Sequence, residues 1–384
     1  TLVPGANTFN GGITFNNAGG NATPTITGGT ITLGSNISAT NDNLSFTPTI
    51  ASAVDLGAGT RTITTGGLSP VDLIISGIIS NGTLTKAGTG ALVLSGANTF
   101  AGGVNLTAGS LVIANAAGLG TGTLTITDGA KLLAGGATVA VTNAITANTK
   151  LIFGVTQQNL TLNGAITFGT ATPTITVENA FQGNTTLTAT IGAAFGGSTI
   201  TGFVKDGPGT LLINATSNAR LTGSITVNDG ALNAGAQYAL GGSLYTAGPT
   251  ITLNSGGAYN DAISNVYVQN TVTLTGNGII GATAANAAIG AVTLNSGATL
   301  LGVQGGQTST VFGALTLNGS GGTTINTSNQ FNVLGAFSGT TSSFTKTIPK
   351  TMLLGGTSTY TGGIIVDQGA LDRKSIVSGT NVNL

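Results

Sequence analysis

The chain has 384 residues, only 5% of them charged, and ten basic residues balance ten acidic ones to a net charge of zero. Without cysteine or histidine, it cannot form disulfides, thiolate or histidine metal sites, or catalytic triads of the Ser-His-Asp or Cys-His type. The few lysines and arginines are scattered, which argues against nucleic acid as a partner, and no run of about 18 apolar residues predicts a transmembrane helix.

The composition predicts an all-β fold. Threonine, valine and isoleucine favour extended strands, because branching at Cβ restricts χ1 and packs well on a pleated surface. The 64 glycines, together with many asparagines, suit tight turns that need a positive φ. No segment of about 10–12 residues keeps a helical apolar spacing free of glycine, and the short stretch Ala282–Ile289 is the only helix candidate.

One long motif recurs four times along the chain. Its copies lie near residues 2–15, 84–114, 203–233 and 344–372. Aligned without a gap, the second and fourth copies match Lys86 with Lys346, Phe100 with Tyr360, and Gly102-Gly103 with Gly362-Gly363. The third copy keeps a lysine, Lys205, but has Ala219 at the position of the aromatic residue. A recurring unit of this length predicts a repeat architecture.

A shorter unit lies within and between the long copies. It alternates apolar and polar residues, breaks at a small or polar residue followed by glycine, and then resumes with an apolar residue, as in Val104–Val112. Successive units start at Val104 and Leu124, at Ile225 and Ile251, and at Val292 and Leu315. The steps between them are unequal, at roughly 20 residues or somewhat more, which favours the stacked turns of a β-solenoid. Hairpins, which would use similar turn residues, are the less favoured explanation.

The long motif resembles the autotransporter-associated β-strand repeat, which occurs in the passenger region of type V secreted proteins of Gram-negative bacteria. The residues that carry the resemblance are Gly88–Gly90, Leu92, Leu94, Ser95-Gly96, Asn98-Thr99-Phe100, Gly102-Gly103, Leu106, Gly109 and Leu111. The resemblance implies a right-handed parallel β-helix that a C-terminal outer-membrane β-barrel exports. We therefore expect residues 1–371 to form a single elongated solenoid, followed by an irregular or truncated tail at residues 372–384.

Each repeat residue has an expected structural role. The amide of Asn98 is expected to stack with its equivalents in a ladder inside a turn. Phe100, Tyr360 and Phe9 are expected to fill the core beside that turn. The pairs Gly102-Gly103 and Gly362-Gly363 are expected to allow a sharp corner with positive φ. The predicted site residues are therefore structural, namely Asn98, Phe100, Gly102, Gly103, Tyr360, Gly362 and Gly363, with no catalytic, metal-binding or cofactor-binding residues.

A carbohydrate-active enzyme is the alternative function, because many parallel β-helices cleave polysaccharides. Glycoside hydrolysis needs two carboxyl groups about 5–9.5 Å apart. Asp206 could stack with Asp229, and Asp55 with Asp72, because each pair is separated in the sequence by about one turn of a solenoid. Turn formation is the favoured explanation, since Asp128, Asp206 and Asp229 each precede glycine.

Paired threonines suggest a minor alternative, an ice-binding solenoid. The pairs lie at Thr125–Thr127, Thr174–Thr176, Thr250–Thr252 and Thr271–Thr275. Their spacing along the chain is not constant, and outward polar positions on half-buried strands are the favoured explanation.

These observations predict a non-catalytic stalk, structural and adhesive, from the passenger of an autotransporter-like protein at the cell surface or outside the cell. Glycans, other surface proteins and further copies of the chain are the expected partners; nucleic acid and cofactors are not. The chain begins within a repeat and shows no signal peptide at Thr1–Pro4, so we expect it to be a fragment of a longer protein that carries the outer-membrane barrel.

Overall fold

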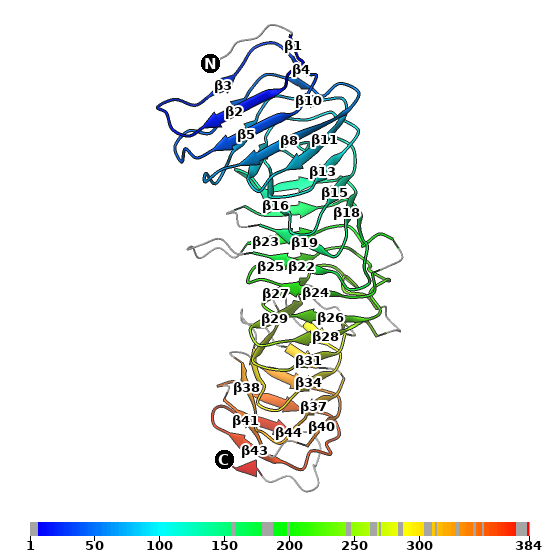
Figure 1. The fold of residues 1–384 in the computed structure, drawn as a ribbon. Helices are drawn as coiled ribbons and strands as arrows, with labels where there is room; N and C mark the ends of the chain where they lie inside the picture. Colours follow the sequence, from blue (N-terminus) through cyan, green and yellow to red (C-terminus); the bar gives the residue numbers. More distant parts are fainter. Residues whose placement is uncertain are drawn as a thin grey trace. The chain divides into compact units, whose positions relative to one another are not determined.

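The computed structural model shows a chain built from β-strands (Figure 1). It describes residues 7–154, 158–178, 187–197, 200–242, 247–261, 267–268, 270–282, 287–302, 309–311, 313–327, 330–340, 343–347, 349–373 and 382–383. Among these residues every regular element is a strand, and no helix is long and apolar enough to cross a membrane. Within each unit the described strands stack in parallel as a β-solenoid, with about 14 turns in all, which confirms the predicted all-β solenoid fold.

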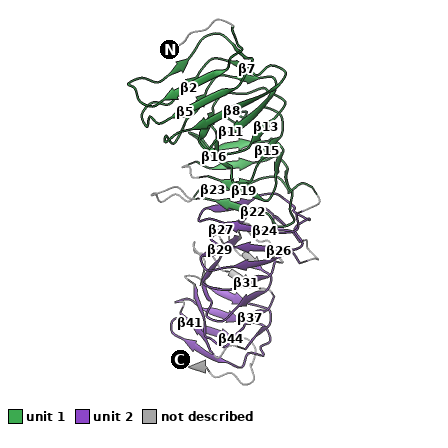
Figure 2. Cartoon of the chain, viewed as in Figure 1, with its two compact units in different colours: residues 1–199 green, residues 200–384 purple. Residues whose placement is uncertain are grey.

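The chain divides into two compact units, residues 1–199 and residues 200–384 (Figure 2). The first unit contains four parallel stacks of strands, which we name sheets B, C, A1 and D1. Sheet B contains β1 (Asn7–Phe9), β4 (Ile31–Leu33), β7 (Val54–Asp55) and β10 (Ile79–Ser80). Sheet C contains β2 (Ile13–Asn17), β5 (Ile37–Asn41), β8 (Thr60–Gly66), β11 (Thr83–Ala87), β13 (Val104–Leu106), β15 (Leu124–Ile126), β18 (Ile145–Ala147) and β21 (Ile166–Phe168). Sheet A1 contains β3 (Thr25–Ile26), β6 (Thr49–Ile50), β9 (Leu73–Ile75), β12 (Ala91–Leu94), β14 (Ser110–Ile113), β16 (Lys131–Ala134), β19 (Lys150–Phe153) and β22 (Thr174–Val177). Sheet D1 contains β17 (Val139–Val141), β20 (Leu160–Leu162) and β23 (Thr188–Ile191).

The second unit contains three parallel stacks, sheets A2, D2 and E. Sheet A2 contains β24 (Phe203–Asp206), β26 (Ser224–Val227), β28 (Thr250–Leu253), β31 (Val272–Leu274), β34 (Val292–Leu294), β37 (Leu315–Leu317) and β40 (Phe337–Gly339). Sheet D2 contains β25 (Thr210–Ile213), β27 (Gly230–Ala234), β29 (Gly257–Asp261), β32 (Gly278–Ala282), β35 (Thr299–Gly302), β38 (Thr323–Thr327), β41 (Ser343–Lys346), β43 (Gly363–Val366) and β45 (Val382–Asn383). Sheet E contains β30 (Tyr267–Val268), β33 (Ala287–Ile289), β36 (Ser309–Val311), β39 (Phe331–Val333), β42 (Met352–Leu354) and β44 (Leu371–Arg373).

The strand register confirms stacked turns rather than hairpins. Val104 of β13 lies directly beside Leu124 of β15, where the next short unit of the sequence begins. The longer steps between units also bring the start of one unit beside the start of the next. Ile225 lies beside Ile251, and Val292 lies beside Leu315. All of these pairings are parallel, so each step in the sequence is one complete turn of the solenoid.

The core is made of aliphatic side chains that stack in columns along the turns. In sheet C, one fully buried column contains Leu84, Val104, Leu124, Ile145 and Ile166. The neighbours of these residues along each strand point outward, because side chains alternate between the two faces of a strand. One turn alone orders too many residues for the apolar area that it buries, so adjacent turns stabilise one another through this shared core.

Phe100 illustrates how the long motif contributes to the core. Its ring is fully buried just before β13, whereas Phe9 of the first copy is only half-buried. We expect Phe100→Ala to lower the free energy of unfolding by about 3–5 kcal/mol, because it leaves a cavity in a packed interior. Phe9→Ala, the matched control, should cost about 1 kcal/mol. Urea unfolding followed by far-UV circular dichroism measures both, and equal losses would contradict the difference in burial.

Two sequence expectations fall partly outside the described residues. Of the helix candidate Ala282–Ile289, the first residue ends β32 and the last three form β33; residues 283–286 are not described. Of the expected tail at residues 372–384, residues 372 and 373 belong to β44 and residues 382 and 383 to β45; the rest lie outside the described residues.

Candidate functional site

The corner of the second repeat copy is held by Asn98, which is buried between β12 and β13. Its Oδ1 accepts a hydrogen bond of 2.8 Å from the backbone nitrogen of Ile79, in the preceding turn. Its Nδ2 donates to the carbonyl oxygen of Gly118, in the following turn, at 2.7 Å. The side chain therefore joins three successive turns through backbone groups, and these two bonds are not the amide ladder that the sequence suggested.

Amide ladders do form, at other positions. Asn17 donates to Oδ1 of the buried Asn41 at 2.8 Å in the first unit. In the second unit, Asn254 donates to Asn228 at 2.7 Å. Asn17 and Asn41 lie opposite each other on paired strands, and Asn228 and Asn254 directly follow two paired strands. In both cases the two residues are one turn apart, and the parallel register brings like side chains together.

The third repeat copy has the same corner with a shifted alignment. Asn218 is buried and donates through Nδ2 to the carbonyl oxygen of Ala239 at 2.6 Å, as Asn98 does to Gly118. Leu221 is fully buried just before β26, as Phe100 is just before β13. The alignment that placed Ala219 at the position of the aromatic residue is therefore wrong for this copy.

The glycine pair of the second copy meets two different constraints. Gly103 has a φ of 83°, and a Cβ atom there would lie 2.3 Å from the carbonyl oxygen of Thr123 in the next turn. At Gly102 a Cβ atom would lie 2.1 Å from Oγ1 of Thr83 in the preceding turn. Gly12 of the first copy, with a φ of 80°, repeats the geometry of Gly103. Gly363 of the fourth copy instead opens strand β43.

Three lysines of the long motif are fully buried, which the sequence did not indicate. They are Lys86, Lys205 and Lys346. Nζ of Lys86 donates to the carbonyl oxygens of Ala87, Gly88 and Ala108, at 2.8, 2.9 and 3.0 Å.

The lysine of the third copy repeats this arrangement. Nζ of Lys205 donates to the carbonyl oxygens of Asp206, Gly207 and Asp229, at 3.1, 2.5 and 2.8 Å. Lys346 of the fourth copy donates to the carbonyl oxygen of Gln368, again one turn ahead. We call this arrangement the lysine cap: an ammonium group that closes its own strand end and ties it to the following turn.

Burial controls the ionisation of the lysine caps. Loss of solvation lowers the pKa of Lys86 to about 8, although the charge of Asp72 acts in the opposite direction. The same cause lowers the pKa of Lys205 to about 8, opposed by the charges of Asp229 and Asp206. It also lowers the pKa of Lys346. An ammonium group that has lost water needs hydrogen-bond acceptors, and the converging carbonyl oxygens supply them.

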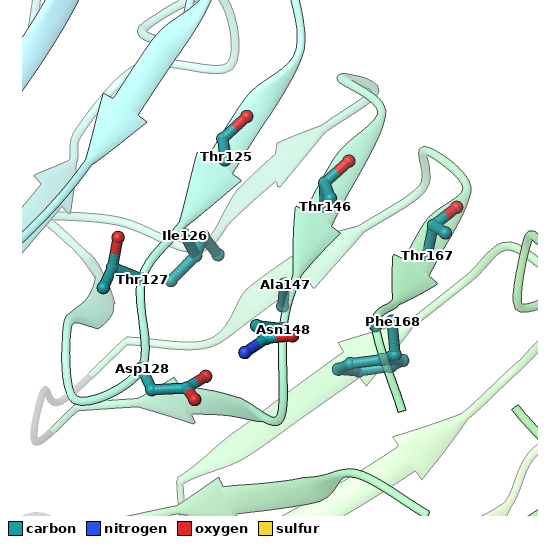
Figure 3. A pocket seen from close by; sticks show the side chains of 10 residues that line it. Thr125, Ile126, Thr127, Asp128, Thr146, Ala147, Asn148, Thr167 and Phe168 are labelled. Atoms are coloured by element: carbon teal, nitrogen blue, oxygen red, sulfur yellow. The ribbon is translucent and has the colours of Figure 1, made fainter. Parts of the chain in front are cut away.

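An open groove of about 470 Å³ lies in the first unit, at the C-terminal ends of β15 (Leu124–Ile126), β18 (Ile145–Ala147) and β21 (Ile166–Phe168) and the residues that follow them. Figure 3 shows Thr125, Thr146 and Thr167 projecting in the same direction from three neighbouring strands, β15, β18 and β21. The groove is also lined by Thr127, Asp128, Asn148 and Phe168. Ile126 and Ala147 line it as well, so its surface is mainly apolar, and the hydroxyl and amide groups and a single carboxylate form its polar part.

The carboxylate of the groove has backbone and hydroxyl partners. Asp128 Oδ1 accepts hydrogen bonds from the backbone nitrogens of Thr149 and Lys150, both at 3.0 Å. The hydroxyl of Thr149 donates to Oδ2. This last bond is the main cause that lowers the pKa of Asp128. The carboxylate therefore stabilises a turn in its charged form, and it does not have the raised pKa of a general acid.

The structure gives different results for the two candidate carboxylate pairs. Asp206 and Asp229 do lie on adjacent turns, because the backbone carbonyls of both accept from Lys205. The pairing of Asp55 with Asp72 is wrong: Asp55 lies beside Ser80 of the following turn and accepts a hydrogen bond from the backbone nitrogen of Gly57. Among the described residues, no group of three or more acidic side chains is placed to hold a metal ion.

Asp72 is fully buried beside β9. Its Oδ2 accepts from the backbone nitrogen of Ala91 at 2.7 Å, while Oδ1 has no hydrogen-bond partner among the described residues. Burial raises its pKa, against the hydrogen bond from Ala91 and the charge of Lys86, which lower it. This carboxyl group therefore belongs to the interior and is not exposed to a substrate.

Parts of the chain are similar to a known repeat family and to a known adhesin. Residues 84–113, 203–234 and 344–372 match the model of the passenger-associated-transport-repeat. A 97-residue segment, 24% of the chain, is 43% identical to "Adhesin BmaC autotransporter" of Brucella suis biovar 1 (strain 1330). The chain spans only 3% of the length of that relative. No solved structure matches. Each matched segment contains one lysine cap, so the three segments that are similar to this repeat share the same buried lysine.

Proposed function

We propose that this chain is part of a surface-exposed or secreted passenger stalk that works as a structural and adhesive element without catalysis. One observation carries the proposal: the three passenger repeats coincide with the three lysine caps. The chemistry that distinguishes these repeats thus serves to join turns. Stacked turns of this kind project whatever is displayed on them, because each turn is stabilised by its neighbours.

The dispersion of the acidic side chains supports a non-catalytic role. Asp42, Asp55, Asp128 and Asp229 each accept a hydrogen bond from a backbone nitrogen in a turn. Asp72 is buried, and Glu178 forms an ion pair of 2.7 Å with Lys131. These carboxyl groups have structural partners of their own.

The groove on sheet C supports the adhesive part of the proposal. Its threonine hydroxyls and the amide of Asn148 suit hydrogen bonding to glycan hydroxyls. Because the chain has few charged residues, we expect one groove to bind one glycan weakly. Display of many copies on one surface raises the avidity of weak contacts by about 10²–10⁴ without any new contact. We therefore infer glycans as the partners, engaged by many copies at once.

A bead assay tests this proposal. Beads coated densely with the chain should bind glycan-bearing cells or the spots of a glycan array. The free chain at the same total concentration should bind these glycans only weakly. We expect Thr146→Lys to reduce bead retention by about tenfold, because it fills the centre of the groove with a long charged side chain. The matched control is Thr161→Lys, which changes a half-buried outward threonine of β20 in sheet D1.

Two outcomes would contradict the proposal. Equal retention by the two variants would remove the groove from the adhesive surface. Release of shortened oligosaccharides by the chain, lost in the Asp206→Asn/Asp229→Asn double variant, would replace the stalk with a carbohydrate-active enzyme. Protease shaving of intact cells that make the full-length protein tests its display at the surface, since a passenger outside the cell is digested.

A further inference from the structure

Sheet A2 of the second unit carries two straight columns of uncharged polar side chains. The first, which we call the threonine column, contains Thr226, Thr252, Thr273, Thr293, Thr316 and Ser338, paired one after another along six turns. The second, the asparagine column, lies two residues further along each turn and contains Asn228, Asn254, Thr275, Asn295, Asn318 and Thr340. Figure 1 shows the strands of these turns, β26, β28, β31, β34, β37 and β40, in order.

The backbone holds the asparagine column in register. The nitrogens of Asn254 and Thr275 donate to the carbonyl oxygens of Val227 and Leu253, at 2.9 and 3.0 Å, so each residue is tied to the turn before it. Asn295, Asn318 and Thr340 make the same bond to the preceding turn. Both columns therefore continue without a break across the sheet.

Contacts between neighbours fix the side chains as well. Nδ2 of Asn254 donates to Asn228, and the hydroxyl of Thr275 donates to Oδ1 of Asn254 at 2.8 Å. In the threonine column the hydroxyls of Thr316 and Ser338 are 3.3 Å apart. The threonines are half-buried and β-branched, which restricts χ1. Such a surface loses little conformational entropy when it binds a rigid partner.

The array is free of charge over all six turns. Asp206 ends β24, which pairs with β26, and Asp229 directly follows Asn228, so among the described residues beside the two columns the charged groups lie at one end. The groove of the first unit differs, because it contains Asp128. An uncharged array complements an uncharged partner, since no strongly held hydration shell must be stripped from it.

The spacing of the array is that of a regular lattice. Adjacent turns of a parallel sheet lie about 4.8 Å apart, and this spacing repeats along both columns; the asparagine column directly follows the strand ends. Each threonine offers a methyl group, which orders water around it, beside a hydroxyl group, which bonds to that water. A face that repeats on every turn in this way can order water along the columns and between them.

We propose that the threonine and asparagine columns of sheet A2 form an ice-binding face. The varied spacing of the paired threonines along the chain argued against this function in the sequence. The structure removes that objection, because steps of unequal length along the chain all bring the next residue of the column to the adjacent turn. This activity is independent of the proposed adhesive stalk, which stands if ice binding fails.

Inhibition of ice recrystallisation by the purified chain tests the proposal. The wild-type chain should inhibit recrystallisation and enter growing ice. Thr293→Lys, in the middle of the threonine column, should raise the concentration needed by at least about tenfold, because a long charged side chain breaks the flat lattice. Thr293→Val keeps the methyl groups and should retain most of the activity, whereas Thr293→Ser removes a methyl group and should lose it.

Thr324→Lys is the matched control, because it places the same charge at a half-buried outward threonine of β38, in sheet D2. It should leave ice activity unchanged, and circular dichroism of each variant checks its fold. No inhibition by the folded wild-type chain would overturn the proposal, as would equal losses in Thr293→Lys and Thr324→Lys. Binding to an insoluble crystalline polysaccharide in place of ice, abolished by Thr293→Lys, would also overturn it and assign the face to a glycan.

Discussion

We expect Lys86→Met to lower the free energy of unfolding by about 3 kcal/mol, because each buried acceptor left without its donor costs about 1–3 kcal/mol. Methionine preserves the length and apolar stem of lysine, so the loss isolates the ammonium group and its hydrogen bonds to three carbonyl oxygens. Urea unfolding followed by far-UV circular dichroism measures the loss, and hydrogen exchange at β11 and β13 locates it.

The control for this prediction is Lys150→Met. Lys150 begins β19 and is not fully buried, so its replacement should change the free energy of unfolding by less than about 0.5 kcal/mol. If Lys86→Met is as mild as this control, the lysine cap contributes nothing to stability. The coincidence of the caps with the passenger repeats then needs another explanation.

The pH dependence of the same variant gives a second readout. Burial lowers the pKa of Lys86 from 10.5 to about 8, so between these values the unfolded chain binds more protons than the folded chain. The contribution of Lys86 to stability therefore rises with pH across this window. As the pH rises across this window, the free energy of unfolding of the wild type should increase relative to that of Lys86→Met. The increase should be at most about 1.4 kcal/mol per pH unit. A change in the opposite direction would mean that the carbonyl oxygens hold the ammonium form more strongly than burial opposes it.

Gly103→Ala should be the most damaging of the small substitutions, with a loss of about 3 kcal/mol or more in the free energy of unfolding, because it combines backbone strain with overpacking. The residue has a φ of 83°, which alanine adopts only with strain. The added Cβ would lie 2.3 Å from the carbonyl oxygen of Thr123, which accepts the hydrogen bond of Val104 between two turns. Relief of this contact separates the turns, so the ladder between β13 and β15 weakens as well.

Two further glycines separate the causes of this loss. Gly129 also has a positive φ, 91°, but nothing lies within 4 Å of an added Cβ, so Gly129→Ala should cost only about 1 kcal/mol. Gly19 has neither a positive φ nor a close neighbour, so Gly19→Ala should be neutral. Urea unfolding of the three variants should rank them in this order. A loss at Gly129 equal to that at Gly103 would show that strain alone, and not contact between turns, decides the cost.

The strand and turn units could be predicted from the sequence because they are local. Alternation of apolar and polar residues places one face of each strand in the core, and a small or polar residue followed by glycine ends it. The units at Val104 and Leu124 are also similar enough to imply stacking, which their parallel pairing confirms. The aligned residues Phe100 and Tyr360 are both fully buried, so repetition carried information about the core.

The misplaced residues of the third copy have a simple cause. A corner between two strands can take extra residues without changing the strands, and a gapless alignment cannot show where they enter. Asn218 lies where its side chain reaches the next turn, and Leu221 lies where its side chain fills the core. Their spacing in the sequence therefore differs from that of the second copy. The pairing of Asp55 with Asp72 was wrong for a similar reason, since the turn that leads from Asp55 to its neighbour Ser80 is longer than that spacing and contains Asp72.

From its sequence alone, this protein is determined to be a repetitive β-solenoid of very low charge, because strand periodicity, turn residues and composition are properties of short segments. Only the tertiary structure decided what the turns bring together. A lysine in a strand is expected at the surface, and Lys86 becomes a cap only because the next turn supplies the carbonyl oxygen of Ala108. The threonines of sheet A2 are unevenly spaced along the chain, yet loops of different length absorb the excess residues. The hydrogen-bonded register then places one threonine or serine on each turn.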